Sequence, residues 1–150
     1  MDATVRSARS DEIEAVVAMY EWLFDEPGYR PPQWSPERAA AALREAIAAE
    51  KSMVLVAEGD DGELVGICSA YLDLNSVRYG LRCWVEDLAV HPQRRSSGVG
   101  KALIDEAKAW ARLRGATHFE LDTGLARIDA QRFYERESPL TKGYSYSWAL

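Results

Sequence analysis

The stretch WVEDLAVHPQRRSSGVGKAL, residues 84–103, decides the fold. Its first part belongs to a mostly apolar run over 82–90 that is typical of a β-strand. A short polar loop with Gly98 and Gly100 follows, and apolar residues then recur at helical spacing until Gly115, which ends the helix. The sequence therefore predicts a strand over 82–90 and a helix over about 98–114, joined by a tight glycine-containing loop.

A helix that begins directly after such a loop is suited to bind an anion. Glycine lets the backbone approach a ligand closely. The first amides of a helix lack intrahelical acceptors and carry the positive end of the helix dipole. Arg94, Arg95 and Lys101 add positive charge. The loop therefore predicts a phosphate-binding site, with a tight turn and solvated arginines as the structural alternative.

Two common phosphate-binding motifs do not fit this loop. A P-loop requires G-x-x-x-x-G-K-[ST], whereas Gly100 has Arg95 five positions upstream and Ala102 after the lysine. The dinucleotide fingerprint G-x-G-x-x-G fails because Leu103 stands where the third glycine belongs. The actual spacing is R-x-x-G-x-G, so a nucleotide kinase is disfavoured.

Strands and helices alternate on both sides of this stretch. Helices are expected at 11–24, 35–50, 98–114 and 126–137. Strands are expected at 4–8, 52–58, 63–73, 82–90 and 118–122 and in the alternating tail GYSYSWAL (143–150). Consecutive strands favour antiparallel pairing and the later strand–helix units allow a parallel pair, so an α/β (α+β) fold with a mixed sheet is predicted.

Composition indicates one soluble globular domain over residues 1–150. Apolar residues make up 47% and charged residues 28% of the chain. The net charge of −6 argues against a nucleic-acid binder and against a polybasic membrane protein. The N-terminus lacks the apolar core of a signal peptide, and no run approaches the roughly 20 apolar residues of a membrane span. Cys68 and Cys83 form no C-x-x-C pair, which favours buried thiols in a reducing cytoplasm.

The run V-x-P-x-x-R-x-x-G-x-G-x-x-L, from Val90 to Leu103, resembles the acetyl-CoA motif of GNAT N-acetyltransferases. Ala130, Phe133 and Tyr134, in A-x-x-F-Y-E, resemble the second helix on the CoA side of that family. The resemblance implies a GNAT fold, with a mixed central sheet of about six to seven strands flanked by four helices. It also implies transfer of an acetyl group from acetyl-CoA to a primary amine of a small molecule or peptide, without a metal.

The resemblance implies a set of coenzyme-binding residues as well. Backbone amides from Gly98 onward would bind the diphosphate, and the main chain before the loop would pair with pantetheine as an added strand. Arg127 stands where the family usually has asparagine, so that hydrogen bond to pantetheine is lost or replaced. The expected coenzyme-binding residues are Leu88, Ala89, Val90, Arg94, Arg95, Ser96, Gly98, Val99, Gly100, Lys101, Arg127 and Ala130.

Direct attack on a thioester requires a neutral amine and therefore favours a general base. An alkylamine is neutral in only about one part in 10³ at neutral pH. Glu86 is the first candidate, because partial burial in its apolar strand would help it to take a proton. Asp122, at the end of the next expected strand, is the alternative. Tyr134 is the expected acid for the CoA thiolate, with a buried core tyrosine as the structural alternative.

Asp87 is expected on the acceptor side of the site. The segment WVED (84–87) resembles the aromatic-aliphatic-Glu-Asp segment of diamine acetyltransferases, in which acidic side chains face the amine. Adjacent strand residues point to opposite faces, so Glu86 and Asp87 can share a pocket only if the strand contains a bulge. Trp22 and Trp34 are expected to line the acceptor site, where aromatic rings suit a cation, although ordinary loop packing explains them equally well.

A non-catalytic acyl-CoA-binding GNAT module, acting as a sensor or interaction protein, is the alternative function. The presence of Glu86, Asp122 and Tyr134 disfavours it. The aromatic tail strand offers an edge through which a homodimer could form. The sequence does not identify the amine.

Overall fold

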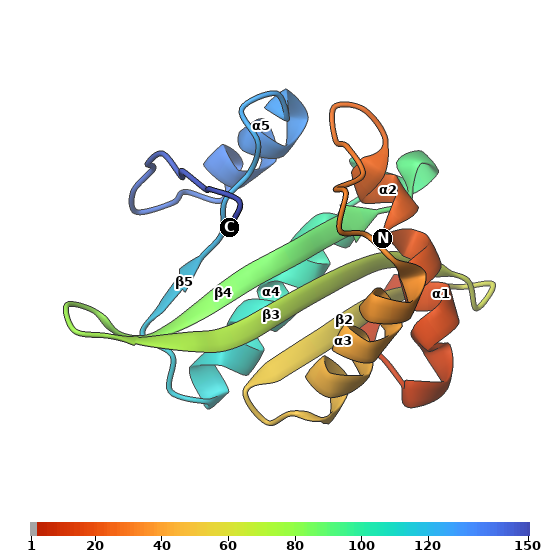
Figure 1. The fold of residues 1–150 in the computed structure, drawn as a ribbon, viewed down its shortest axis with the longest axis horizontal. Coiled ribbons are helices and arrows are strands. Elements are labelled where there is room, and N and C mark those ends of the chain that lie inside the picture. The colour runs from red at the N-terminus through yellow and green to blue at the C-terminus, as the bar shows by residue number, and fades with distance from the viewer. Residues whose placement is uncertain (1–2) are drawn as a thin grey trace.

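The computed structural model describes residues 3–150 and contains one mixed sheet in the order β1-β2-β3-β4-β5 (Figure 1). The strands are β1 Ala3–Ser7, β2 Ser52–Gly59, β3 Leu64–Ser76, β4 Gly80–Val90 and β5 His118–Glu120. Neighbours from β1 to β4 pair antiparallel, whereas β4 and β5 pair parallel. The predicted mixed sheet is confirmed.

Helices cover both faces of this sheet. They are α1 Ile13–Met19, α2 Glu21–Phe24, α3 Pro36–Ala48, α4 Val99–Leu113 and α5 Ile128–Arg136, with 3-10 turns at Ser10–Glu12 and Pro92–Arg94. The helix predicted at 11–24 is divided at Tyr20 into α1 and α2. Ser35 caps α3, since its Oγ accepts a hydrogen bond of 3.1 Å from the Arg38 amide.

Two apolar clusters hold the layers together. One lies between the sheet and α4, whose Val99 and Leu103 are fully buried. The other lies between the opposite face of the sheet and α1 with α3, and it includes Val16. Cys68 and Cys83 are fully buried free thiols of the first cluster, as predicted.

The strand predicted in the tail is wrong, and the sheet has five strands instead of six or seven. Residues 143–150 form no strand, and their aromatic side chains are exposed. Alternation produces a strand only where a partner supplies hydrogen bonds and a surface to pack on. Just before the tail, Lys142 Nζ forms an exposed ion pair with Glu135 Oε1 of α5 at 3.0 Å.

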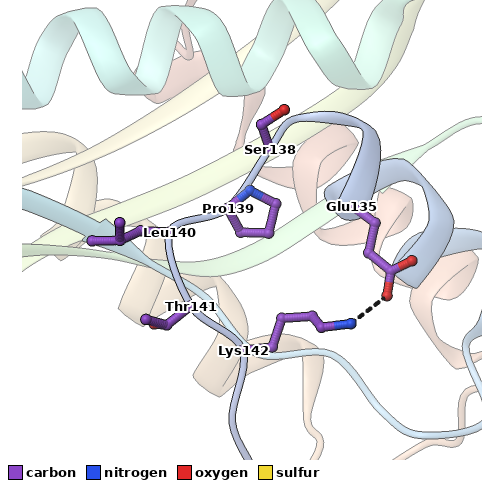
Figure 2. A pocket seen from close by; sticks show the side chains of 6 residues that line it. All are labelled: Glu135, Ser138, Pro139, Leu140, Thr141 and Lys142. Atoms are coloured by element: carbon purple, nitrogen blue, oxygen red, sulfur yellow. Dashed lines mark hydrogen bonds and ion pairs between the residues drawn. The ribbon is translucent and has the colours of Figure 1, made fainter.

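An open hollow of about 460 Å³ lies between the end of α5 and the segment that follows it (Figure 2). The hollow contains none of the residues that the sequence predicts for the coenzyme, the amine or the proton transfers. Its lining residues are Glu135, Ser138, Pro139, Leu140, Thr141 and Lys142. We assign no part of the candidate site to it.

The feature that positions the site is the short pairing of β4 with β5. Only Arg82–Trp84 of β4 pair with His118–Glu120 of β5. β4 continues to Val90, whereas the chain after β5 turns away toward α5 (Figure 1). Among residues 3–150, no strand pairs with positions 85–90 on that side, so β4 ends in an open edge that leads directly into the loop before α4.

Tight packing of α4 on the sheet gives a stability prediction at Gly66. A Cβ at this position would lie 2.9 Å from Leu103 Cδ1 and 3.0 Å from Val99 Cγ1, both in the buried core. We expect Gly66→Val to lower the free energy of unfolding by about 2 kcal/mol and Tm by about 6 °C. Calorimetry measures both. Gly143→Val is the control, because nothing lies within 4 Å of that Cβ, and equal Tm losses in the two variants would contradict the packing argument.

Candidate active site

β4 contains a bulge at Glu86. Ser69 of β3 pairs with Asp87 and Ala70 pairs with Val85, so Glu86 has no partner in the register. Glu86 Oε2 accepts a hydrogen bond of 2.8 Å from Trp84 Nε1. Asp87 turns toward the face covered by α1. The extra residue therefore brings both carboxylates to one face, as the sequence argument required.

Asp87 is the more enclosed of the two carboxylates. Tyr20 donates its hydroxyl proton to Asp87 Oδ2 at 2.7 Å, and Ser69 Oγ lies 3.4 Å from the same oxygen. Burial raises the pKa of Asp87 above its usual range, and the hydrogen bond from Tyr20 opposes that rise. The result is a carboxylate that is held in place and takes a proton more readily than an exposed aspartate.

Glu86 is exposed, so the expectation that it would be partly buried is wrong. A bulged residue lacks an opposite neighbour on the next strand to cover it, and its carboxylate lies in solvent beside the indole of Trp84. Asp122 is also exposed and follows the last residue of β5 by two positions. Its negative charge contributes to the raised pKa of Tyr134.

Tyr134 projects from α5 into a mostly buried position. Burial raises the pKa of its phenol to about 12, and negative charge on Cys68 or Asp122 adds to the rise. The phenol therefore stays protonated at neutral pH and can donate a proton or a hydrogen bond. The preceding residue, Phe133, packs against the core and faces Gly100 at the start of α4.

The loop before α4 leaves the first turn of the helix uncovered. Gly98 has a left-handed φ of 91° and makes no side-chain cap for the helix. A Cβ on Gly100 would lie 3.8 Å from both Phe133 Cζ and Val90 Cγ2, so the position is next to the open edge of β4 without being crowded. The first-turn amides of an α-helix have no intrahelical acceptors. This helix end therefore has the geometry of an anion site.

The basic side chains predicted around the loop do not converge on one point. Lys101 Nζ forms ion pairs with Asp105 at 3.0 Å and Glu137 at 3.2 Å. Arg94 lies by the turn between β2 and β3, where its Nη1 would be 3.3 Å from a Cβ on Gly59. Lys101 and Arg94 therefore make contacts within the chain, although both were expected to bind phosphate.

Two further arginines connect the coenzyme-side segments to α2. Arg127 Nη2 donates to the Leu23 carbonyl at 2.9 Å. Arg95 Nε donates to the Val90 carbonyl at 3.3 Å, and its Nη2 lies 3.5 Å from the Trp22 carbonyl. Arg127 therefore holds α2, in a position where the family pattern has an asparagine for pantetheine.

Aromatic side chains cluster next to Asp87. The rings of Tyr20 and Trp34 stack with centroids 5.5 Å apart, and Phe24 meets Trp34 edge-on at 4.8 Å. Trp22 instead packs against His91 at 5.1 Å, beside the loop before α4. Of the two tryptophans predicted for the acceptor site, Trp34 lies on the carboxylate side and Trp22 on the loop side.

The remaining predicted coenzyme residues lie along the same path. Leu88 and Val90 are partly buried against the α4 cluster, and Ala89 is buried on the opposite face. Ser96 has a positive φ of 61° and is exposed in the loop. Ala130 is half-buried on α5, four positions before Tyr134.

The sequence argument missed Tyr20 and Ser69. Tyr20 fitted the apolar face of the first helix, so its hydroxyl attracted no attention. Ser69 is a buried polar residue inside an apolar strand, only 2% exposed, and such a residue nearly always has a hydrogen-bond partner. A serine inside an apolar strand therefore indicated that a hydrogen-bond partner exists, but it did not identify that partner.

The chain belongs to the acetyltransferase (GNAT) family, whose sequence model matches residues 16–138. An uncharacterized N-acetyltransferase of Bacillus subtilis (strain 168) is 38% identical over 90 residues, 60% of this chain and 63% of that protein. An aminoalkylphosphonate N-acetyltransferase of Salmonella typhimurium is 32% identical over 90 residues, 60% of this chain and 58% of that protein. The chain thus spans about three fifths of the length of these two relatives.

Solved structures share the fold over nearly the whole chain. The aminoglycoside N-acetyltransferase AAC(6')-Iy in complex with CoA superposes with a TM-score of 0.83 at 18% identity, covering 99% of this chain and 94% of that one. A transcriptional regulator from Bacillus halodurans C-125 superposes with a TM-score of 0.82 at 24% identity, covering 99% of both chains. The predicted GNAT fold is confirmed.

Within residues 3–150, no group of three or more His, Cys, Asp or Glu side chains is arranged to hold a metal ion. No helix in the same range is both long and apolar enough to cross a bilayer.

The position of Tyr134 can be tested by alkaline titration. With a pKa of about 12, its phenol should be only about one-tenth ionised at pH 11, where an ordinary tyrosine is about nine-tenths ionised. We therefore expect wild type and Tyr134→Phe to show nearly the same phenolate absorbance up to about pH 11. Circular dichroism over the same pH range should show that both proteins stay folded. One extra phenolate in wild type by that pH would contradict the burial.

Proposed function

We propose that this chain transfers an acetyl group from acetyl-CoA to a primary amine of a small molecule or peptide. The observation that carries the proposal is the open edge of β4, which runs directly into the uncapped start of α4. Asp87 lies on this part of β4, and Tyr134 follows Phe133, which faces the first turn of α4. Membership of the GNAT family and the N-acetyltransferase names of several relatives support it. An aminoglycoside N(6')-acetyltransferase type 1 of Serratia marcescens is a further relative with such a name, and it is 27% identical over 69% of this chain.

The coenzyme-binding path follows the exposed backbone. First-turn amides from Val99 to Lys101 bind the diphosphate, because helix dipole and free N–H groups favour an anion there. The main chain of residues 88–90 pairs with the pantetheine arm as an added strand. Arg95 releases the Val90 carbonyl when this pairing forms, and its guanidinium becomes available for a phosphate.

The residues fit the proton transfers that the reaction needs. The amine nitrogen attacks the thioester carbonyl carbon, the new C–N bond forms, and the C–S bond breaks. Asp87 takes the proton that the amine loses, and Tyr134 gives its phenolic proton to the departing thiolate. The exposure of Glu86 moves our preference for the base to Asp87, and leaves Glu86 with Trp84 to attract the ammonium form of the amine.

The acceptor side favours a cationic amine. Asp87 and Glu86 supply negative charge, and Trp34 supplies an aromatic ring on the Asp87 side. The relatives named for aminoalkylphosphonates and aminoglycosides act on primary amines of small molecules, which suits the same arrangement. We place the reaction in the cytoplasm, on the ground that both cysteines are free and buried. The homodimer stays a prediction.

The first test combines coenzyme binding with turnover. We expect calorimetry to detect CoA binding by wild type and thiol release from acetyl-CoA with at least one amine among polyamines, aminoglycosides, aminoalkylphosphonates and peptides. Gly100→Val should weaken CoA binding at least about tenfold, because its methyl groups cover the first-turn amides while the fold has room for the new Cβ. Gly143→Val is the control.

Two outcomes would contradict the proposal. Tight CoA binding without turnover of any amine would favour the non-catalytic acyl-CoA-binding module. CoA binding that is equal in wild type and Gly100→Val, with both proteins folded by their Tm, would remove the helix end from the site.

A second test separates the three carboxylates. We expect Asp87→Asn to lower kcat/KM by about 10² or more. In wild type, kcat/KM should fall at acidic pH because protonation of Asp87 removes the base, and this fall should be absent in the variant. The fall lies above the usual range of aspartate, since the pKa of Asp87 is raised by burial. Glu86→Gln should raise KM for the amine more than it lowers kcat, and Asp122→Asn should change kcat/KM less than about threefold. If Glu86→Gln or Asp122→Asn loses the acidic limb instead, that residue is the base.

A further inference from the structure

Tyr20 stands at the junction between α1 and α2, far from Asp87 in the sequence but next to it in the fold. The two side chains are separated by 67 positions, and the phenol donates a hydrogen bond of 2.7 Å to Asp87 Oδ2. We infer that Tyr20 is a positioning residue, which holds the Asp87 carboxylate so that Oδ1 faces the acceptor amine. This inference rests on the proposed function, because it gives Asp87 a role in the reaction.

The contacts of Asp87 are one-sided. Tyr20 and Ser69 both approach Oδ2, at 2.7 Å and 3.4 Å. A carboxylate held by one oxygen from two directions has a fixed plane, and the lone pairs of its second oxygen remain for another donor. A general base must lie within hydrogen-bond reach of the proton that it takes, so this fixed plane has a direct value for proton transfer.

Tyr20 is itself fixed by its surroundings. Its ring stacks on Trp34 with a centroid distance of 5.5 Å, and Trp34 is held edge-on by Phe24. Burial raises the pKa of the Tyr20 phenol above its usual range, and the neighbouring charge of Asp87 raises it further. The phenol therefore stays protonated and acts as a donor throughout the range in which Asp87 titrates.

Tyr20 also tunes the proton affinity of Asp87. Burial raises the pKa of Asp87, whereas the hydrogen bond from Tyr20 stabilises the charged form and lowers it. Without the Tyr20 hydroxyl, only the longer contact of Ser69 would oppose the effect of burial on the pKa of Asp87. The other titratable or charged side chains that act on Asp87 or its neighbours are Glu86 on β4, Cys68 and Tyr71 on β3, and Glu45 on α3. None of these side chains donates a hydrogen bond to Asp87 in the described chain, so Tyr20 is the residue to substitute in a test.

The test compares Tyr20→Phe with wild type in two measurements. Phenylalanine keeps the ring that stacks on Trp34 and removes only the donor. NMR of carboxyl-labelled aspartate, with Asp87 assigned from Asp87→Asn, should show the Asp87 titration move upward by about one pH unit, the size expected for a lost hydrogen bond to a charged group. The acidic limb of kcat/KM should move upward by the same amount.

Two further variants define the size and specificity of the effect. Ser69→Ala should shift the titration in the same direction but by less, because its contact is longer at 3.4 Å. Tyr29→Phe is the matched control and should shift nothing, because Tyr29 is 76% exposed in the loop after α2. Tm values establish that every variant is folded.

The outcomes separate this inference from the proposed function. An unchanged Asp87 titration in Tyr20→Phe would overturn the inference. So would a titration that moves while the acidic limb does not follow, or a kcat that falls equally at every pH, since both indicate a merely structural tyrosine. If wild type acetylates no amine, the proposed function fails, whereas the NMR arm still decides whether Tyr20 controls the Asp87 carboxylate.

Discussion

The short parallel pairing of β4 with β5 is the constraint on which the rest of the site depends. Strands that paired along their whole length would use the backbone groups of residues 85–90 to hold each other. Because the pairing stops after Trp84 and Glu120, the end of β4 keeps an open edge inside the molecule, with α5 beyond it (Figure 1). In the proposed function this edge pairs with the pantetheine arm, in the way that a sheet edge pairs with an added extended chain.

The bulge at Glu86 adds the second half of the site. One extra residue turns Asp87 toward the face of α1 while Leu88 and Val90 keep their places against α4. In the proposed reaction, the same segment of β4 presents main chain to the coenzyme at its edge and carboxylates to the amine on its face. A half-buried carboxylate costs free energy, and the hydrogen bonds from Tyr20 and Ser69 offset part of that cost.

Features with local causes could be predicted from the sequence, and those with distant causes could not. The α4 segment depends on apolar residues at regular spacing within one helix, so periodicity predicted it. The sequence showed that Glu86 and Asp87 could share a pocket only if the strand contained a bulge, but the position of the bulge depends on how β3 pairs with β4. The hydrogen bond between Tyr20 and Asp87 joins positions 67 residues apart, and no pattern within one element indicates it. The prediction of a strand in the tail failed for the same reason. Alternating side chains show which faces a strand would have but not whether a partner strand exists.

The arginines connect the two halves of the site through α2. A helix of four residues is too short to be stable alone, so α2 depends on its contacts. Arg127 from the start of α5 and Arg95 from the loop before α4 both reach carbonyls at this helix, where backbone acceptors lack intrahelical partners. On the other side, Phe24 at the end of α2 holds Trp34, and Trp34 stacks on Tyr20. Contacts thus run without interruption from the loop before α4, through α2, to the Asp87 carboxylate. The same short helix therefore helps to position both the loop that we propose for the coenzyme and the carboxylate that we propose for the amine.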